Sequence, residues 1–133
     1  MALIADNLVT SEPQPRLIGG RHTGSGKIVF PMPSGGEAAL YEPMELSAEG
    51  TLWSWSVQRF LPKSPPYMGP ETVETFKPFV FGYVELPGEV IVETRIVGAD
   101  EASLKIGMPM RTTLVDFEHK ERGTVQTFAF TPA

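Results

Sequence analysis

The sequence predicts an all-β fold, and three observations lead to this prediction. Apolar and polar residues alternate with a period of two in several segments, which is typical of strands that bury one face. The 13 glycines and 13 prolines are concentrated in 17–49 and 61–78, where turns and loops are expected. Helix signals are few, and between the expected strands they are found in one short segment, 99–107, with a start at Asp100 and a stop at Gly107.

Five segments after residue 50 have this strand pattern and together predict a five-stranded Greek-key barrel, the OB-fold. Alternation in the first segment is expected to place Trp53, Trp55 and Val57 on one face of the sheet. A turn at 87–89 joins the second segment to the third as a hairpin. An immunoglobulin-like sandwich is the weaker alternative, because it needs about seven strands. The expected barrel strands are 51–60, 79–86, 90–97, 109–118 and 124–130.

The chain is predicted to divide into an N-terminal leader at 1–16, a small lobe at 17–49 and the barrel at 50–133. The leader has several leucine and isoleucine residues before its prolines, which predicts one or two helical turns. These apolar side chains need a surface to cover, either the core of this domain or a partner protein.

The small lobe combines glycine-rich turns with two short extended segments. Residues 19–26 contain four of the chain's glycines and predict a turn, and 27–30 predicts a short strand. We expect the segment 38–46 to pair with that strand as a small hairpin.

The charge of the chain disfavours several classes of partner. Eleven basic and 16 acidic side chains give a net charge of −5 and a pI near 5.0. A nucleic-acid-binding protein needs a basic surface to neutralise phosphates, so neither DNA nor RNA is an expected partner. The apolar runs are far shorter than the roughly 20 residues of a membrane-spanning helix, and the first residues lack the basic region of a signal peptide. We expect a cytoplasmic protein without a membrane partner.

No catalytic residue is predicted. The chain contains no cysteine, which excludes disulfides, thiolate metal ligands and a cysteine nucleophile. Ser25 lacks the Gly-x-Ser-x-Gly context of a nucleophile elbow, and His22 and His119 lie in separate turns without an orienting third group. Carboxylates such as Glu85, which alternation places on the same face as Phe79, Phe81 and Tyr83, are interpreted as solvated surface groups.

The connection 61–78 is a candidate binding loop. It contains five prolines, and loops longer than about 15 residues are uncommon unless they have a function. Tyr67, Met68 and Phe76 are apolar side chains that a disordered linker would not need, and they are predicted to contact a partner or ligand. Trp53 and Trp55 could stack on bases. The net negative charge of the chain disfavours that role, so both tryptophans are interpreted as packing or protein-interface residues.

Several motifs, in their order, resemble one known family. The run from Gly20 to Pro31 is similar to the start of a rubredoxin-like zinc ribbon, in which a Cys-x2-Cys pair precedes a glycine, a short strand and Phe-Pro. Further stretches resemble the barrel of the same family, namely 45–52, 78–86, 96–98 and 105–110. This is the zinc-ribbon/OB-fold group known as domain of unknown function thirty-five, whose members are commonly partners of thiolase-like proteins in acyl-CoA metabolism. The resemblance covers about residues 16–130.

The resemblance implies a non-catalytic accessory subunit for a thiolase or a lipid-transfer-type aldolase that acts on acyl-CoA thioesters. Degradation of steroid or other lipid or aromatic acyl chains is the setting it suggests. The partner would supply the catalytic groups in a two-plus-two heterotetramer, with acyl-CoA shared at or near the interface. A stand-alone acyl-CoA- or small-ligand-binding module is the alternative, and a nucleic-acid-binding OB domain is a weaker one.

The sequence departs from this family at the metal ligands. His22 and Ser25 stand where the first cysteine pair is expected, and the second pair falls in 33–36, which has no ligand. A structural zinc site needs four ligands, so no zinc is predicted and the only expected ligand is a shared CoA thioester. The lobe must then be ordered by packing or by a partner, which adds Phe30 to the predicted contact residues. His22 is predicted to meet an anionic ligand or a partner carboxylate.

Overall fold

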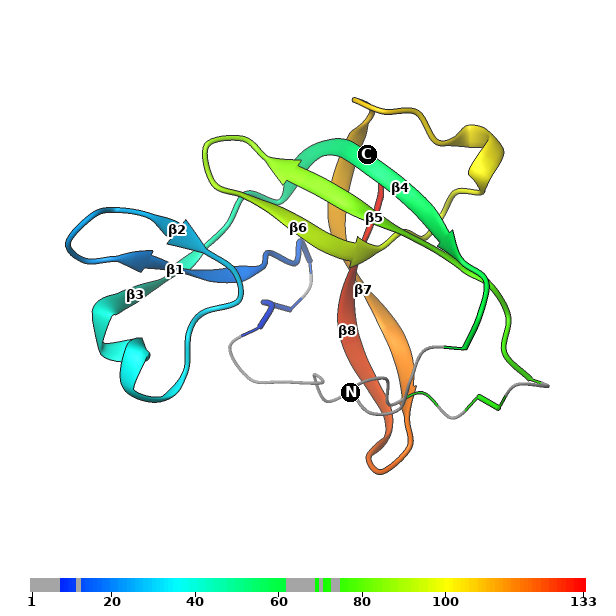
Figure 1. Cartoon of the computed structure of the whole chain (residues 1–133), viewed down its shortest axis with the longest axis horizontal. Helices are drawn as coiled ribbons and strands as arrows, with labels where there is room; N and C mark the ends of the chain where they lie inside the picture. The colour runs from blue at the N-terminus through cyan, green and yellow to red at the C-terminus, as the bar shows by residue number, and fades with distance from the viewer. Residues whose placement is uncertain (1–7, 12, 62–68, 70, 73–74) are drawn as a thin grey trace.

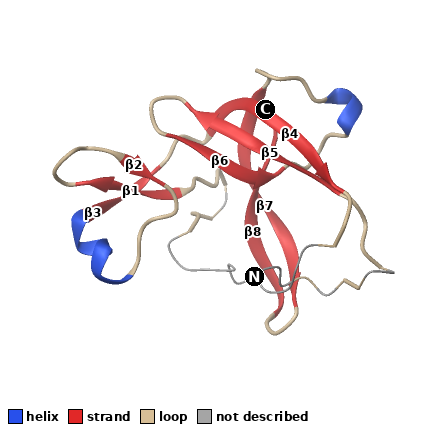
Figure 2. Cartoon of the chain, viewed as in Figure 1, coloured by secondary structure: helices blue, strands red, loops and turns tan. Residues whose placement is uncertain are grey.

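The fold consists of two antiparallel β-sheets and very little helix (Figure 1, Figure 2). The computed structural model describes residues 8–11, 13–61, 69, 71–72 and 75–133. Two short 3₁₀ helices are the helical elements of these residues, and neither has the length and hydropathy needed to cross a bilayer. The predicted all-β class is confirmed. The elements are β1 (Ile18–His22), β2 (Ile28–Val29), η1 (Gly35–Leu40), β3 (Tyr41–Glu45), β4 (Glu49–Gln58), β5 (Phe79–Leu86), β6 (Val90–Arg95), η2 (Glu101–Ser103), β7 (Pro109–His119) and β8 (Gly123–Pro132).

The five-stranded sheet is a curled, partly open barrel. Its strand order is β6–β5–β4–β7–β8, so β4 pairs with β5 on one side and with β7 on the other. The two ends of the sheet meet where Ile96 pairs in parallel with Phe130, and the N–H of Val97 donates to the Phe130 carbonyl at 2.9 Å. A meander of three strands followed by a returning hairpin is the Greek-key arrangement of an OB-fold. The predicted OB-fold is confirmed.

A short helical turn separates β6 from β7, as the sequence predicts. The carboxylate of Asp100 accepts a hydrogen bond from the N–H of Ser103 at 3.1 Å, which caps the first turn of η2. Gly107 has a φ of 87°, a conformation that favours glycine, and its N–H donates to the Leu52 carbonyl at 2.7 Å. This bond ties the turn to β4 and sets where β7 begins.

One hydrophobic core joins described residues of the N-terminal segment, the lobe and the barrel. Leu52, Val84 and Phe130 are almost fully buried inside the barrel. Val9 and Leu17 from the N-terminal segment and Leu46 from the link between lobe and barrel belong to the same cluster. The boundaries at 16/17 and 49/50 stay predictions, and this core crosses both of them. The other members of the cluster are Leu86, Val92, Ile96, Leu104 and Met110.

The small lobe is a three-stranded sheet of order β2–β1–β3. Its central strand is the glycine-rich segment that the sequence analysis interprets as a turn, and the predicted hairpin between 27–30 and 38–46 is wrong. Both segments pair with β1 instead, with Gly20 opposite Val29 on one side and Pro43 on the other. Glycine permits this close approach, because a Cβ on Gly19 would lie 2.6 Å from the Val29 carbonyl oxygen.

The N-terminal segment folds back onto the chain's own core. Val9 forms an antiparallel bridge with Leu17, and the N–H of Ile18 donates to the Leu8 carbonyl at 2.9 Å. Val9 and Leu17 are buried. The predicted helical turns are therefore absent from the described part of this segment, while 1–7 and residue 12 lie outside the described residues. The proline-containing stretch that precedes Leu17 acts as the bend of a small hairpin.

A β-bulge in β4 places the two tryptophans on opposite faces. Leu52 pairs with Val84 and Ser54 with Tyr83, so Trp53 is an extra residue between two consecutive pairs. Trp53 is 54% exposed, whereas Trp55 packs against the core. The prediction that both share one face is wrong, because a bulge shifts the alternation by one residue. The partner of Trp55 is a glycine, Gly82.

Candidate functional site: an aromatic face on the barrel

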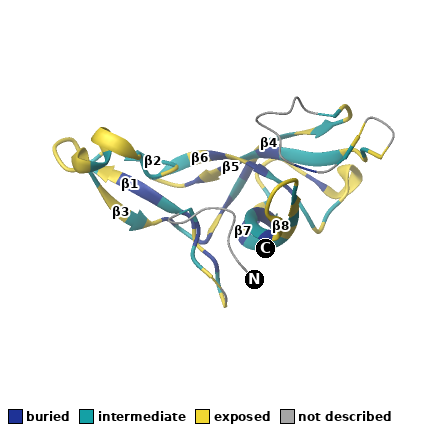
Figure 3. Cartoon of the chain, turned by 90° about the horizontal axis from the view of Figure 1, so that it is seen from below, coloured by how far each residue is buried: buried dark blue, intermediate teal, exposed yellow. Residues whose placement is uncertain are grey.

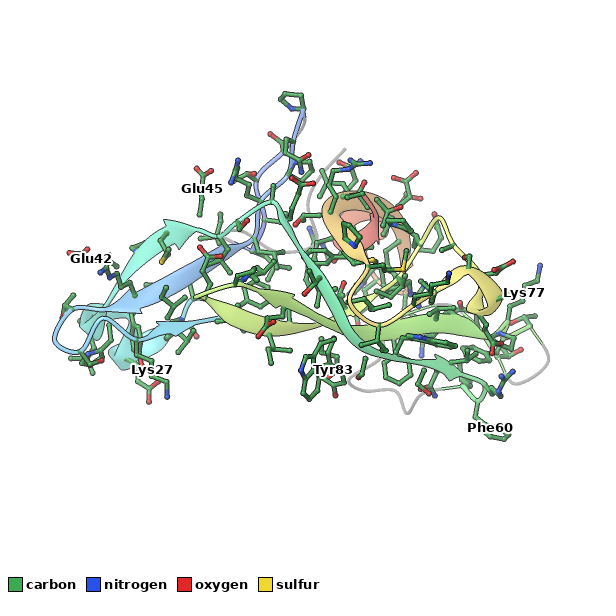
Figure 4. The ribbon with its side chains drawn as sticks, turned by 90° about the horizontal axis from the view of Figure 1, so that it is seen from above. Lys27, Glu42, Glu45, Phe60, Lys77 and Tyr83 are labelled. Atoms are coloured by element: carbon green, nitrogen blue, oxygen red, sulfur yellow. The ribbon has the colours of Figure 1, made fainter. Side chains whose placement is uncertain are left out.

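Aromatic side chains line the outer face of β5. In this strand Val84 and Leu86 are buried in the barrel, while the alternate positions Phe79, Phe81 and Tyr83 are only partly buried. Figure 3 shows β4, β5 and β6 as part of one elongated layer with β7 and β8 on one side of it. In Figure 4 the side chain of Tyr83 points to the side away from β7 and β8. The uncovered side of an antiparallel sheet is normally polar, so these rings are candidates for an interaction.

Two further rings extend this surface, which we call the aromatic face: Trp53, Phe76, Phe79, Phe81 and Tyr83. The rings of Trp53 and Tyr83 meet edge to face with centroids 6.2 Å apart, and those of Phe76 and Phe79 do so at 6.0 Å. Such pairs stabilise one another by about 0.5–1.5 kcal/mol beyond their burial. The aromatic face is thus an apolar surface whose rings contact one another in pairs.

The neighbouring strand leaves these rings accessible. Ser54 and Ser56 of β4 pair with Tyr83 and Phe81, and serine is too small to cover an aromatic ring. Phe60, just beyond the end of β4, is 81% exposed and projects to the same side as Tyr83 in Figure 4. Large exposed apolar patches with polar neighbours are typical of protein interaction sites.

A pocket of about 570 Å³ opens beside the aromatic face, where β5 and β6 approach β8. The guanidinium of Arg95 lies over the Phe79 ring, 3.7 Å from its centroid. The described lining of the pocket has aromatic walls, one cation and one carboxylate, and contains no histidine or serine. The residues that line it are Gln58, Phe79, Phe81, Glu93, Thr94, Arg95, Thr127 and Phe128.

His22 serves as a hydrogen-bond acceptor inside the first turn of the lobe. The N–H groups of Gly24 and Ser25 donate to its Nδ1 at 3.2 and 3.0 Å, and the Ser25 hydroxyl lies 3.1 Å from the same atom. An Nδ1 that accepts from the backbone places the ring proton on Nε2. Nε2 remains a donor that no described residue uses, which is compatible with the predicted contact to an anion.

His119 repeats this arrangement at the tip of the β7–β8 hairpin. Its Nδ1 accepts from the N–H groups of Glu121 and Arg122 at 3.1 and 3.2 Å. Each histidine is followed four residues later by a glycine with positive φ, Gly26 at 76° and Gly123 at 74°. The repeated His-x3-Gly spacing is the sequence signal for this capping role, which is absent from the predictions above.

The residues at the family's metal positions do not fit zinc. Nδ1 of His22 is engaged by the turn, and Ser25 offers a hydroxyl that contacts that same nitrogen. The segment 33–36 supplies no metal ligand. No three side chains from His, Cys, Asp and Glu gather within the described ranges in a way that could hold a metal ion. The contact between the two positions closes the turn without a metal.

We expect His22→Ala to destabilise the protein by about 1 kcal/mol, because two N–H groups of the turn lose their acceptor. His22→Asn should retain most of the stability, since an asparagine oxygen can accept from the N–H two residues further on. Urea unfolding of the three proteins measures the difference. Equal destabilisation by both substitutions would show that the acceptor is not what the imidazole contributes.

The structure separates the predicted contact residues into groups. Trp53 and Phe76 lie on the aromatic face, while His22 lies in the lobe. Trp55 and Phe30 pack against the core, and the Phe30 ring meets Phe128 edge to face at 5.6 Å. Tyr67 and Met68 lie outside the described residues. Alternation predicts that Phe79, Phe81 and Tyr83 share one face, but they are not among the predicted contact residues.

Comparisons with known proteins agree with the observed fold. The family model of the ChsH2 C-terminal OB-fold domain matches residues 44–115, which include most of the barrel and the aromatic face. A solved structure described as an Ltp2–ChsH2(DUF35) aldolase superposes with a TM-score of 0.61 at 20% identity, over 88% of this chain and 84% of that chain. No curated protein matches the sequence. Because the family model covers more than half of the chain, we conclude that the chain belongs to the ChsH2 C-terminal OB-fold domain family.

Proposed function

We propose that this chain is a non-catalytic accessory subunit of a thiolase-like enzyme, either a thiolase or a lipid-transfer-type aldolase, that acts on acyl-CoA thioesters. Membership of the ChsH2 OB-fold family supports the proposal, as does the likeness to a structure whose description names an aldolase. The observation that carries it is the aromatic face, an apolar surface on the outer side of the sheet that the described residues cover only in part. In this assignment the partner supplies the catalytic groups.

The aromatic face has the composition of a protein interface. Tryptophan, tyrosine and arginine are enriched among the residues that dominate binding energy, and Trp53, Tyr83 and Arg95 lie on or beside this face. Tyr67 and Met68, in the loop that precedes Phe76, are proposed as further contacts. Prolines restrict that loop, so less conformational entropy is lost when it docks.

We extend the proposal to the assembly and its setting. The complex is a heterotetramer of two accessory and two thiolase-like chains, with the acyl-CoA substrate at or near the interface. It works in the cytoplasm, in the degradation of steroid or other lipid or aromatic acyl chains. In the lobe, Nε2 of His22, which no described residue uses, donates to an anionic group of the partner or ligand. Phe30 and Trp55 contribute indirectly, because they pack against the core and so hold the lobe and β4 in position.

Co-expression with thiolase-like proteins encoded nearby in the genome tests the proposal. We expect one of them to co-elute with this chain in size-exclusion chromatography, at a mass that corresponds to two copies of each. The complex should turn over its acyl-CoA substrate, and the isolated chain should not. Failure of every neighbouring thiolase-like protein to co-elute, together with a well-behaved monomer, would overturn the accessory role.

A stand-alone ligand-binding module is the second candidate, and the pocket beside Arg95 favours it. A volume of about 570 Å³ falls in the range that small-molecule sites occupy. Calorimetry with the isolated chain and acyl-CoA thioesters separates the two functions. Micromolar binding without a partner supports the module, whereas weak or absent binding supports the accessory subunit.

A further inference from the structure

Arg95 carries a partly buried charge that has no counter-ion among the described residues. Its guanidinium lies on the Phe79 ring, and it forms no ion pair or side-chain hydrogen bond with any described residue. One ion pair of the described chain joins Arg59 to Glu101, on exposed side chains. Removing a charge from water is unfavourable unless a partner compensates it. An arginine held in this way is therefore poised to accept an anion.

The surroundings of Arg95 restrict what that anion can be. A stacked guanidinium keeps its N–H groups in its own plane, and their forked arrangement matches the two oxygens of a carboxylate. Phe79, Phe81 and Phe128 supply apolar walls, which suit an apolar body attached to the anion. Glu93 also lines the pocket, and its negative charge repels a doubly charged group such as phosphate more strongly than a single carboxylate.

We propose that this pocket binds a carboxylate carried on an apolar group. Arg95 pairs with the two carboxylate oxygens, and the three phenylalanine rings cover the apolar body. A free carboxylic acid and an acidic side chain of a protein docked on the aromatic face present the same chemistry. This site is an addition to the accessory role, and a test of carboxylate binding can fail without affecting the evidence for that role.

Benzoate is the probe, and benzamide is its neutral match because it has the same ring and nearly the same size. We expect an NMR titration of the full chain to show benzoate binding with a Kd on the order of 1 mM, with shifts centred on Thr94 and Thr127. Benzamide should bind at least about tenfold more weakly, since it lacks the charge that Arg95 recognises. Equal binding of the two compounds, or no binding of either, would overturn the proposal.

Three variants identify the residues responsible. Arg95→Met keeps an unbranched apolar stem and should weaken benzoate binding at least about tenfold. Arg111→Met is the matched control, because Arg111 is exposed on β7 and does not line the pocket. Glu93→Gln should strengthen binding severalfold, an effect that a variant with a damaged fold would not produce. Unchanged affinity in Arg95→Met would exclude the arginine as the recognition group.

Competition separates the two sources of the carboxylate. If the thiolase-like partner displaces benzoate, the natural occupant is an acidic side chain of that partner. If the assembled complex binds benzoate as the isolated chain does, the occupant is a free acid. A chain that binds its partner but never benzoate would disprove this site and leave the accessory role intact.

Discussion

Trp53→Ala is expected to weaken binding of the thiolase-like partner by about 10- to 100-fold. Trp53 is 54% exposed and contacts Tyr83 edge to face. It therefore presents a large apolar surface, and its side chain loses little conformational entropy when a partner binds. Truncation of a central aromatic side chain commonly costs about 2 kcal/mol or more of binding energy. Isothermal titration calorimetry with the purified partner measures the change in Kd.

Ile106→Ala is the matched control for this experiment. Ile106 is also a large exposed apolar residue, at 64%, but it lies in the link between η2 and β7 rather than on the aromatic face. The control should bind the partner as the unmodified chain does, and both variants should unfold at nearly the same temperature. Identical Kd values for all three proteins would remove Trp53 from the interface.

Phe130→Ala is expected to reduce the free energy of unfolding by about 3–5 kcal/mol, the typical cost of removing a buried phenylalanine ring. Phe130 is completely buried, and its backbone closes the barrel through the parallel pair with Ile96. Loss of its ring leaves a cavity at the point where the two ends of the sheet meet. Urea unfolding followed by circular dichroism measures the change.

Phe60→Ala provides the same chemical change at an exposed position. Because Phe60 is 81% exposed, its removal should alter the free energy of unfolding by no more than about 0.5 kcal/mol. Comparable destabilisation by the two substitutions would contradict the placement of Phe130 in the core.

The barrel could be predicted because its signals are local. Alternation marks β5 and β6, the turn at 87–89 joins them, and Asp100 caps η2.

The lobe could not be predicted in the same way. Its central strand consists of residues such as Gly19 and Gly20, whose composition indicates a turn. Their role depends on the close approach of β2, a tertiary contact that no local pattern encodes.

The candidate site was only partly accessible to sequence reasoning. The alternation in β5 correctly groups Phe79, Phe81 and Tyr83, but a polar or solvated face and an interaction face look alike until the covering layers are known. The position of Trp53 depends on a bulge, which one extra residue creates without any change in composition. The approach of β8 to Arg95 joins residues more than 30 positions apart and follows from barrel closure alone.

The bulge in β4 also equips the protein with two separate optical probes. Indole fluorescence depends on the polarity around the ring, and the chain has two tryptophans, one on each side of the sheet. In Trp55→Phe the remaining emission comes from the exposed Trp53, so it should respond to a partner that covers this side. In Trp53→Phe the remaining emission comes from Trp55, packed against the core, so it should follow unfolding. Docking and folding can thus be recorded as two signals from one chain without an added label.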